Sequence, residues 1–245
     1  MKLRHLTVRV TETVHYVQLS GTALGRREAY ELEYAVNAIA TATESVRVIV
    51  LCSAGPDFCP GPDPDLEPLT AGCDPAAAIA ACSMPVVAAL RGRTDSVGLE
   101  LALAADLRIA DGTARLSFPD VASGRLPCWG GTQRLPRAAG RGMSARMILT
   151  GEELDADQAL ACGLVHRVSD GDLDPAVDSL VLRLTSLPPL ALAAAKEALT
   201  RGPELPMRHA LELEGDLNHL LQTTSDRAEG LAAFLQKRPP HFEGR

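Results

Sequence analysis

The sequence predicts an α/β fold with a C-terminal part built from helices alone. Along the chain, the expected elements read strand, strand, helix, then strand–helix units, then only helices. Segment 47–53 is a continuous apolar run, which is typical of a strand buried on both faces of a sheet. Of the 245 residues, 46% are apolar and 22% are charged, which is enough for a sizeable core.

The first third of the chain carries signals for two strands and two helices. Segments 3–10 and 14–20 alternate as strands do, with a turn between them, and 26–42 places part of its apolar residues on one helical face. A loop rich in Pro, Gly and Asp covers 54–67. Asp74 and Pro75 are typical of an N-cap and a first helical position, so we expect a short helix to Cys82.

The middle of the chain continues with strands at 85–90, 107–110 and 115–118. Between the first two, Asp95 or Ser96 is expected to cap a helix that runs to about residue 105. After Gly131 the pattern is helical. A helix capped by Asp155 is expected to end at Gly163, followed by a last strand at 164–168.

From residue 175 onward the pattern is helical, interrupted at three Pro-containing pairs, 188–189, 202–203 and 239–240. We therefore expect an α/β core over residues 1–188 and a helical oligomerisation region over 189–245. A lone appendage cannot bury the apolar residues of 207–236, so this stretch is expected to pack on the core or on another subunit. These residues are Leu211, Leu213, Leu217, Leu220, Leu221, Leu231 and Phe234.

Composition argues against several classes of protein. A net charge of −7 and 3% aromatic residues disfavour nucleic-acid binding. The N-terminus lacks a signal-peptide pattern and no apolar run reaches the ~20 residues of a membrane helix, so a cytoplasmic protein is expected. The six cysteines form no C-x-x-C pair and do not cluster with His, which predicts free thiols and no metal site.

Four segments carry a family resemblance in the order and spacing of the family's own motifs. They read VLCSAGPDFCPGPD (50–63), MPVVAALRG (84–92), GLELALAADLRIA (98–110), and FPDVASGRLP (118–127) followed by GGTQRLP (130–136). The stretches LTG (149–151), ALACGLV (159–165) and KRPPHF (237–242) also match. The chain thus resembles the enoyl-CoA hydratase/isomerase (crotonase) family. The resemblance implies a crotonase-like spiral of β-β-α units, an acyl-CoA thioester substrate, and a homotrimer or a dimer of trimers.

The resemblance places the family's two catalytic carboxylates at Glu100 and Asp120. Glu100 lies among leucines at a helix start, where burial would raise its pKa as a general acid or base requires. Taken alone, it could be a charge favoured by the helix dipole. Asp120 could be a turn residue, and it is one methylene shorter than the Glu that the family commonly has.

The resemblance also places the two oxyanion-hole amides, and here the sequence departs from the family. The first position is Pro62, or Pro64 if the register slides by two, and proline has no N–H. The second is Val97, whose branched side chain is expected to narrow the approach. Asp95, as an N-cap, would accept the N–H bonds that an enolate oxygen needs.

Ligand-binding positions follow from the same alignment of motifs. Leu24, Arg26, Gly61 and Asp63 are expected to contact CoA, although Arg26 and its neighbour Arg27 could equally be a solvated helix start. Cys128 and Trp129 are expected to line or plug the acyl pocket, or to fill the core. Neither Cys128 nor Cys59 has an adjacent His, so neither is expected to be a nucleophile.

Two functions stay open at this point. The first is an enoyl-CoA hydratase or isomerase that uses Glu100 and Asp120 and needs no cofactor beyond the CoA of its substrate. The second is a catalytically weak or inactive family member that binds acyl-CoA or a protein partner, which Pro62, Val97 and Asp95 favour. A Clp-like serine peptidase is a poor third, because Ser96 is the only candidate nucleophile and the sequence places no convincing His or Asp beside it.

Overall fold

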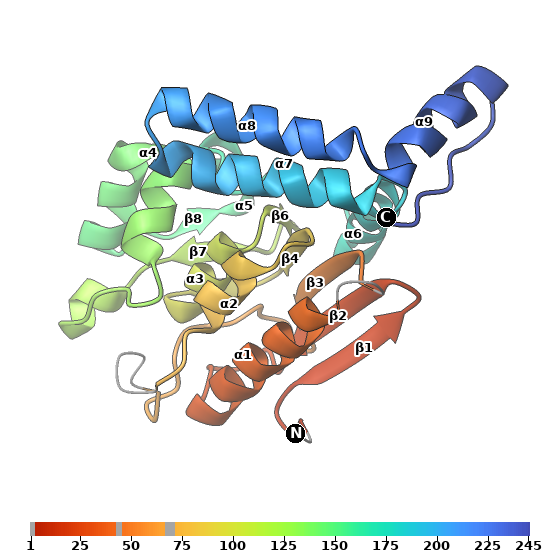
Figure 1. Cartoon of the computed structure of the whole chain (residues 1–245). Coiled ribbons are helices and arrows are strands. Elements are labelled where there is room, and N and C mark those ends of the chain that lie inside the picture. Colours follow the sequence, from red (N-terminus) through yellow and green to blue (C-terminus); the bar gives the residue numbers. More distant parts are fainter. Residues whose placement is uncertain (1–2, 43–45, 67–71) are drawn as a thin grey trace.

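The strands of the protein form two sheets, as the computed structural model of residues 3–42, 46–66 and 72–245 shows (Figure 1). Within these residues the larger sheet has six strands in the order β1-β2-β3-β4-β6-β9, and the smaller has the order β5-β7-β8. In the larger sheet only β1 and β2 are antiparallel. The strands are β1 (Thr7–Thr11), β2 (Val14–Leu19), β3 (Val48–Ser53), β4 (Val86–Leu90), β5 (Arg93–Asp95), β6 (Leu107–Ala110), β7 (Arg115–Ser117), β8 (Leu154–Asp155) and β9 (Arg167–Val168).

The β-β-α spiral expected from the motifs is confirmed. Strand β4 belongs to the larger sheet, β5 directly after it belongs to the smaller sheet, and helix α3 follows; β6 and β7 then repeat the alternation. The core helices are α1 (Arg26–Thr41), α2 (Pro75–Ala81), α3 (Val97–Ala104), α4 (Gly131–Thr150, broken at Gly140), α5 (Ala156–Ala161) and α6 (Leu173–Thr185), with the one-turn helix η1 (Asp120–Ser123) after β7.

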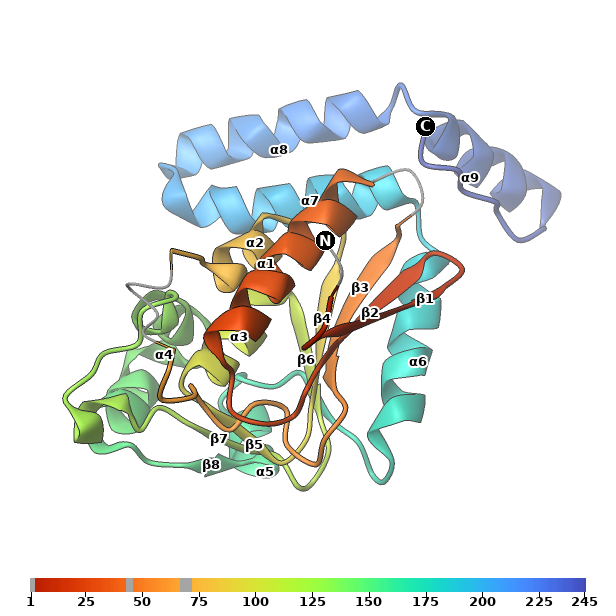
Figure 2. The same cartoon turned by 90° about the horizontal axis from the view of Figure 1, so that it is seen from below.

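Helices cover both faces of the larger sheet, which explains the apolar run of β3 (Figure 2). Ile49 and Leu51 join the cluster that includes residues of α1, α2 and α3. Val48 and Val50 point the other way, into the cluster that α6 covers. Alternate side chains of a strand face opposite sides, so a strand between two helical layers has no polar face.

Most local signals are confirmed and a few boundaries differ. Asp74 accepts a hydrogen bond from the Ala77 amide, and Asp155 forms a capping box with Gln158. Helix α6 begins at Leu173, before the expected residue 175, because Asp172 caps it. The expected strand 164–168 shrinks to β9. The sequence reading missed β5 and β8 altogether.

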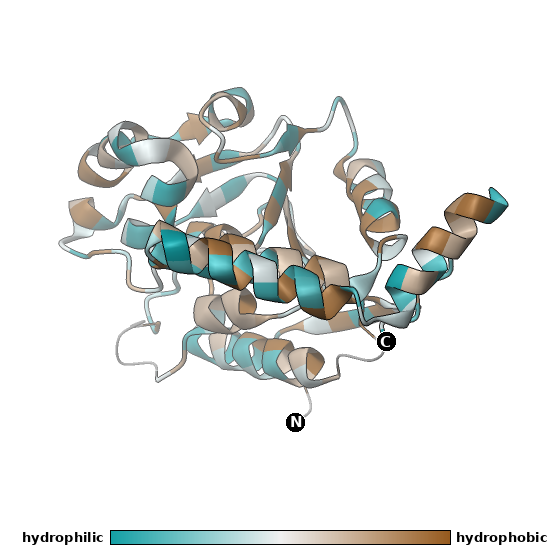
Figure 3. Cartoon of the chain, turned by 45° about the horizontal axis from the view of Figure 1, so that its top comes forward, coloured by the Kyte–Doolittle hydropathy of each residue, from teal (hydrophilic) through white to brown (hydrophobic). Residues whose placement is uncertain are grey.

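The C-terminal helices lie over one end of the core, and α9 extends away from it (Figure 1). They are α7 (Pro189–Arg201), the one-turn η2 (Gly202–Glu204), α8 (Met207–Leu221) and α9 (Ser225–Gln236). Hydrophobic and hydrophilic segments alternate along α8, and hydrophobic segments make up much of α9 (Figure 3). Exposed apolar residues on these helices include Leu199, Met207, Leu211, Leu220, Leu231, Phe234 and Leu235.

In the described part of the chain, no helix taken singly has the length and apolarity to cross a bilayer. Two consecutive helical segments, Leu173–Thr185 and Pro189–Glu204, reach the length and apolarity of a membrane span only when they are taken together, and the angle between them is 105°.

Candidate active site

Glu100 is a fully buried carboxylate in the first turn of α3. Its Oε1 accepts hydrogen bonds from the backbone amides of Trp129, at 2.7 Å, and Gly131, at 2.8 Å, and Oε2 accepts a longer one from Cys128, at 3.4 Å. Burial raises the pKa of Glu100 to about 7; the charge of Asp120 adds to that rise, and the three backbone donors oppose it. The side chain is therefore more than a surface charge at a helix start, and it can exchange a proton near neutral pH.

Asp120 is the second buried carboxylate and begins η1, two residues after the end of β7. Its Oδ1 accepts a hydrogen bond from the Ser96 hydroxyl at 2.5 Å. Its Oδ2 is buried and has no partner among the described residues. Both carboxylates that the motifs indicated are therefore buried, and the charge of Asp120 acts on Glu100.

Pro62, which the resemblance indicates as the position of the first oxyanion donor, offers no N–H. The segment is fixed in extended backbone: Pro62 pairs with Leu24 in an isolated parallel bridge, in which the Leu24 amide donates to the Gly61 carbonyl and the Asp63 amide to the Leu24 carbonyl, each at 2.9 Å. This loop faces the start of α3, since a Cβ placed on Gly61 would lie 4.0 Å from the Cβ of Ser96.

The second expected donor, the Val97 amide, is the first helical amide of α3. First-turn amides have no acceptor within their own helix, and none is found for this one in the described residues. The Val97 side chain is 2% exposed and belongs to the main core cluster. The amide therefore stands available for an anion at a helix N-terminus.

The expectation that Asp95 caps α3 is wrong. Asp95 is the last residue of β5, and its carboxylate accepts hydrogen bonds from Arg93 Nε, at 2.9 Å, and from the Ser117 hydroxyl, at 2.7 Å. Burial raises the pKa of Asp95, while the Ser117 and Arg93 donors lower it. Because Asp95 is engaged away from the helix, it does not compete for the Val97 amide. Ser96 holds the cap position and makes no side-chain cap bond either.

Trp129 and Cys128 adjoin Glu100 through their backbone amides. The Trp129 side chain is 3% exposed and packs in the core cluster, with its indole Nε1 unpartnered among the described residues. Burial raises the pKa of the Cys128 thiol, and the charge of Glu100 raises it further. Cys128 thus stays protonated, as expected of a cysteine that is not a nucleophile.

The residues expected to contact CoA divide into buried and exposed ones. Leu24 is buried, so its side chain contributes to the core, whereas Arg26 is exposed and its amide donates to Asp65 at 3.3 Å. A cavity of about 440 Å³ opens beside this segment, and its lining includes Arg27 rather than Arg26. It is lined by Arg4, His5, Ser20, Thr22, Ala23, Gly25, Arg27, Glu28, Asp63 and Asp65.

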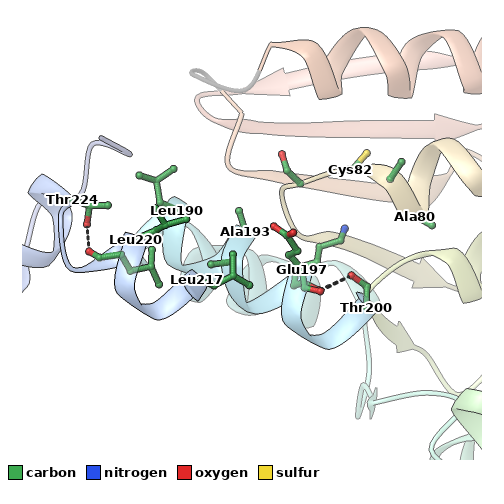
Figure 4. Close-up of a pocket in the computed structure, with 14 residues that line it drawn as sticks. Ala80, Cys82, Leu190, Ala193, Glu197, Thr200, Leu217, Leu220 and Thr224 are labelled. Carbon is green, nitrogen blue, oxygen red and sulfur yellow. Dashed lines mark hydrogen bonds between the residues drawn. The ribbon is translucent and has the colours of Figure 1, made fainter. Parts of the chain in front are cut away.

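A larger cavity, of about 510 Å³, lies apart from the carboxylates, between the end of α2 and helices α7 and α8 (Figure 4). None of the site residues expected from the sequence lines it. Its lining includes Ala80, Cys82, Leu190, Ala193, Glu197, Thr200, Leu217, Leu220 and Thr224.

Comparison with known proteins shows the family to which the sequence is similar. A family model described as enoyl-CoA hydratase/isomerase matches residues 11–245. The 2,3-dehydroadipyl-CoA hydratase of Escherichia coli is 42% identical over 171 residues, which cover 69% of this chain and 67% of that protein. The (E)-benzylidenesuccinyl-CoA hydratase of Thauera aromatica is 35% identical over 210 residues, covering 81% and 82%.

Solved structures give the same result over the whole chain. A crystal structure titled as an enoyl-CoA hydratase subunit I from Geobacillus kaustophilus superposes with a TM-score of 0.91 at 33% identity, covering 100% of both chains. An enoyl-CoA hydratase from Bacillus anthracis gives 0.89 at 29% identity, covering 99% of this chain and 100% of that one.

Proposed function

Because the chain belongs to the enoyl-CoA hydratase/isomerase family and is an acyl-CoA enzyme of that family, we propose that it adds water across the double bond of a 2-enoyl-CoA. The observation that supports this most strongly is the buried pair Glu100 and Asp120 beside the available Val97 amide. Hydration needs one group to take a proton from water, another to supply one to carbon, and a donor for the thioester oxygen.

The proposed reaction uses each of these groups once. The Val97 amide donates to the thioester oxygen, where the N-terminus of α3 favours the developing negative charge. Asp120, through its unpartnered Oδ2, takes a proton from water while the water oxygen bonds to the β-carbon. Glu100 delivers its proton to the α-carbon. The product is a 3-hydroxyacyl-CoA. The proton held by Asp120 then passes through solvent to Glu100, which returns both carboxyls to their starting states.

Because Pro62 has no amide hydrogen, we expect a low kcat for hydration. One oxyanion donor is typically worth about 10²–10³ in kcat. We therefore propose that wild-type hydration of a short enoyl-CoA is weak beside that of family members with both donors. The absence of competition from Asp95 leaves the Val97 donor intact, which favours a slow enzyme over an inactive one.

Turnover of crotonyl-CoA by the wild type, Glu100→Gln and Asp120→Asn tests this function. Each variant keeps the shape of the side chain and removes the titrating group, so we expect a loss of about 10²-fold or more with the fold unchanged. Asp226→Asn is the matched control, since Asp226 is a buried carboxylate that accepts hydrogen bonds from the backbone amides of Glu243 and Gly244, in the C-terminal segment. Wild-type rates in both site variants would exclude the mechanism.

The second candidate, a member that binds acyl-CoA without converting it, is favoured by Pro62 alone. It predicts that a CoA thioester raises the melting temperature while no product forms, because a ligand selective for the folded state stabilises it. The same thermal shift together with measurable 3-hydroxyacyl-CoA supports the hydratase.

We further propose that the protein works as a homotrimer or a dimer of trimers in a reducing, cytoplasmic environment, and needs no metal or nucleotide cofactor. The exposed apolar residues of α7–α9 support the assembly, and six free cysteines support the compartment. The cofactor proposal rests on the chemistry, because carboxylates alone can move the protons. Activity that survives dialysis against a chelator supports it, and loss of activity would contradict it.

A further inference from the structure

Ser96 occupies a backbone conformation that favours glycine. It is the single residue between β5 and α3, with φ of 51° and ψ of −120°. A side chain in this region is strained, and such strain persists where the surroundings over-determine it. Ser96 is held on both sides, because its amide donates to the Ser117 carbonyl and its own carbonyl accepts from the Glu100 amide, each at 3.0 Å.

The Ser96 hydroxyl donates a hydrogen bond to Asp120. The two side chains are buried, with residue exposures of 2% and 5%, and Oγ lies 2.5 Å from Oδ1. Because an aspartate carboxylate has no hydrogen to donate, the hydroxyl is the donor. A glycine would fit the backbone better at this position but would leave both carboxylate oxygens of Asp120 without a partner.

The same side chain also adjoins the segment that lacks an oxyanion amide. Its Cβ lies 4.0 Å from the position of a Cβ on Gly61, next to Pro62, and the next residue along the chain is Val97 with its available amide. Ser96 therefore adjoins the segment that contains Gly61 and Pro62, the start of α3, and the carboxylate of Asp120.

We propose that Ser96 is a positioning residue for Asp120. Its hydroxyl fixes Oδ1, so that Oδ2 faces the substrate, and it compensates for an acid that is one methylene shorter than Glu. This inference rests on the proposed hydration, in which Asp120 takes a proton from water.

The test compares Ser96→Gly and Ser96→Ala with the wild type. Both variants lose the hydroxyl, and only Ser96→Gly relieves the backbone. We expect kcat for crotonyl-CoA hydration to fall about 10- to 100-fold in both, with KM little changed, because the hydrogen bond involves a charged group. In the Asp120→Asn background, Ser96→Ala is expected to lower kcat no further, because Ser96 acts through that carboxylate. Ser96→Gly should melt at a higher temperature than Ser96→Ala, because it alone relieves the backbone.

Ser117→Ala is the matched control, since it removes a buried Ser–Asp hydrogen bond of similar length, at 2.7 Å, from Asp95 instead of Asp120. It is expected to lower the melting temperature without lowering kcat. A merely structural Ser96 would behave in the same way, with lower stability and unchanged kcat, and that result would overturn the proposal.

A readout that needs no turnover separates failure of this inference from failure of the proposed function. The carboxyl carbon signal of Asp120, assigned by its loss in Asp120→Asn, is recorded by NMR at one fixed pH. Its chemical shift should differ from the wild type in Ser96→Gly and Ser96→Ala and keep the wild-type value in Ser117→Ala, even if no enoyl-CoA is hydrated. An Asp120 signal that moves in neither Ser96 variant overturns the positioning role. Acylation of Ser96 by the thioester, seen as added protein mass with release of CoA, would overturn it in favour of a nucleophilic serine.

Discussion

Single residues decide the chemistry of this site, and Pro62 is the most consequential. A backbone amide cannot be replaced by a side chain of the same residue, so Pro62→Ala is the direct repair. We expect kcat for crotonyl-CoA to rise, because one oxyanion donor lowers the activation free energy by ~2.7–4 kcal/mol. Part of this gain is lost because alanine leaves the loop backbone freer to move than proline does. Pro64→Ala is the control, because Pro64 is exposed and lies outside the bridge with Leu24. An equal gain from Pro64→Ala would show that the register is misplaced by two residues.

Glu100 gives the site its pH dependence. If Glu100 supplies the proton to carbon, kcat/KM falls as pH rises through about 7, the value to which burial raises the pKa of this carboxyl. A pH–rate profile measures this directly. A profile that stays flat from pH 6 to pH 8, on the order of one unit to each side of that pKa, would remove Glu100 from the acid role.

The same pKa has a consequence for stability. The folded-state pKa of Glu100 exceeds the ordinary value of 4.5, so its contribution is fully present below that value and is lost as pH rises through about 7. Glu100→Gln stays uncharged and escapes this loss, which can reach about 3 kcal/mol. Urea unfolding from pH 5 to pH 8 should show the variant gaining on the wild type; a constant difference would contradict the buried titration.

At the scale of elements, strand β5 explains why the sequence-based prediction of Asp95 as the cap of α3 was wrong. Its three residues, Arg93–Asp95, carry two charges and give no apolar pattern, so Asp95 read as a helix cap. In the structure the strand continues to Asp95 and turns its carboxylate toward β7. The residues that hold this segment are distant in sequence: Ser117 lies 22 residues from Asp95, and Asp120 lies 24 residues from Ser96. A local sequence pattern cannot reveal such partners. The backbone conformation of Ser96 costs about 1–3 kcal/mol. Residue preferences alone would therefore not predict a serine at this position.

Asp95→Ala tests this revised role of the strand. Removing the carboxylate leaves Ser117 and Arg93 without their partner, so we expect a loss of about 1–3 kcal/mol in unfolding free energy. Because Asp95 does not occupy the Val97 amide, turnover should show no gain, alone or combined with Pro62→Ala. A clear gain in turnover from Asp95→Ala would restore the capping interpretation.

For the whole molecule, the resemblance of the motifs to one family predicted the spiral fold and the positions of Glu100 and Asp120. Such a motif stays recognisable because parts of its backbone leave no room for substitution. Gly98, for example, has no room for a side chain, since a Cβ there would lie 2.5 Å from the Cys59 carbonyl oxygen. The boundary between residues 188 and 189, the assembly and the roles of the site residues stay predictions, because none of them follows from the fold of one chain.

The proposed assembly predicts that charges on α9 dissociate it. Phe234 and Leu235 are 79% and 72% exposed in the single chain. We expect Phe234→Asp combined with Leu235→Asp to reduce the mass measured by light scattering at micromolar concentration. Val10→Asp, at a 55% exposed apolar position on β1, is the control expected to keep the assembled mass. A wild type that measures as a monomer would contradict the assembly.

The most direct test of the central claim is the mass of the product formed from crotonyl-CoA in water labelled with heavy oxygen. Hydration by Glu100 and Asp120 predicts a 3-hydroxyacyl-CoA that carries one labelled oxygen and keeps its thioester, formed by the wild type and lost in Asp120→Asn. A product of unchanged mass, release of free CoA, or labelled product formed equally by Asp120→Asn would contradict the account.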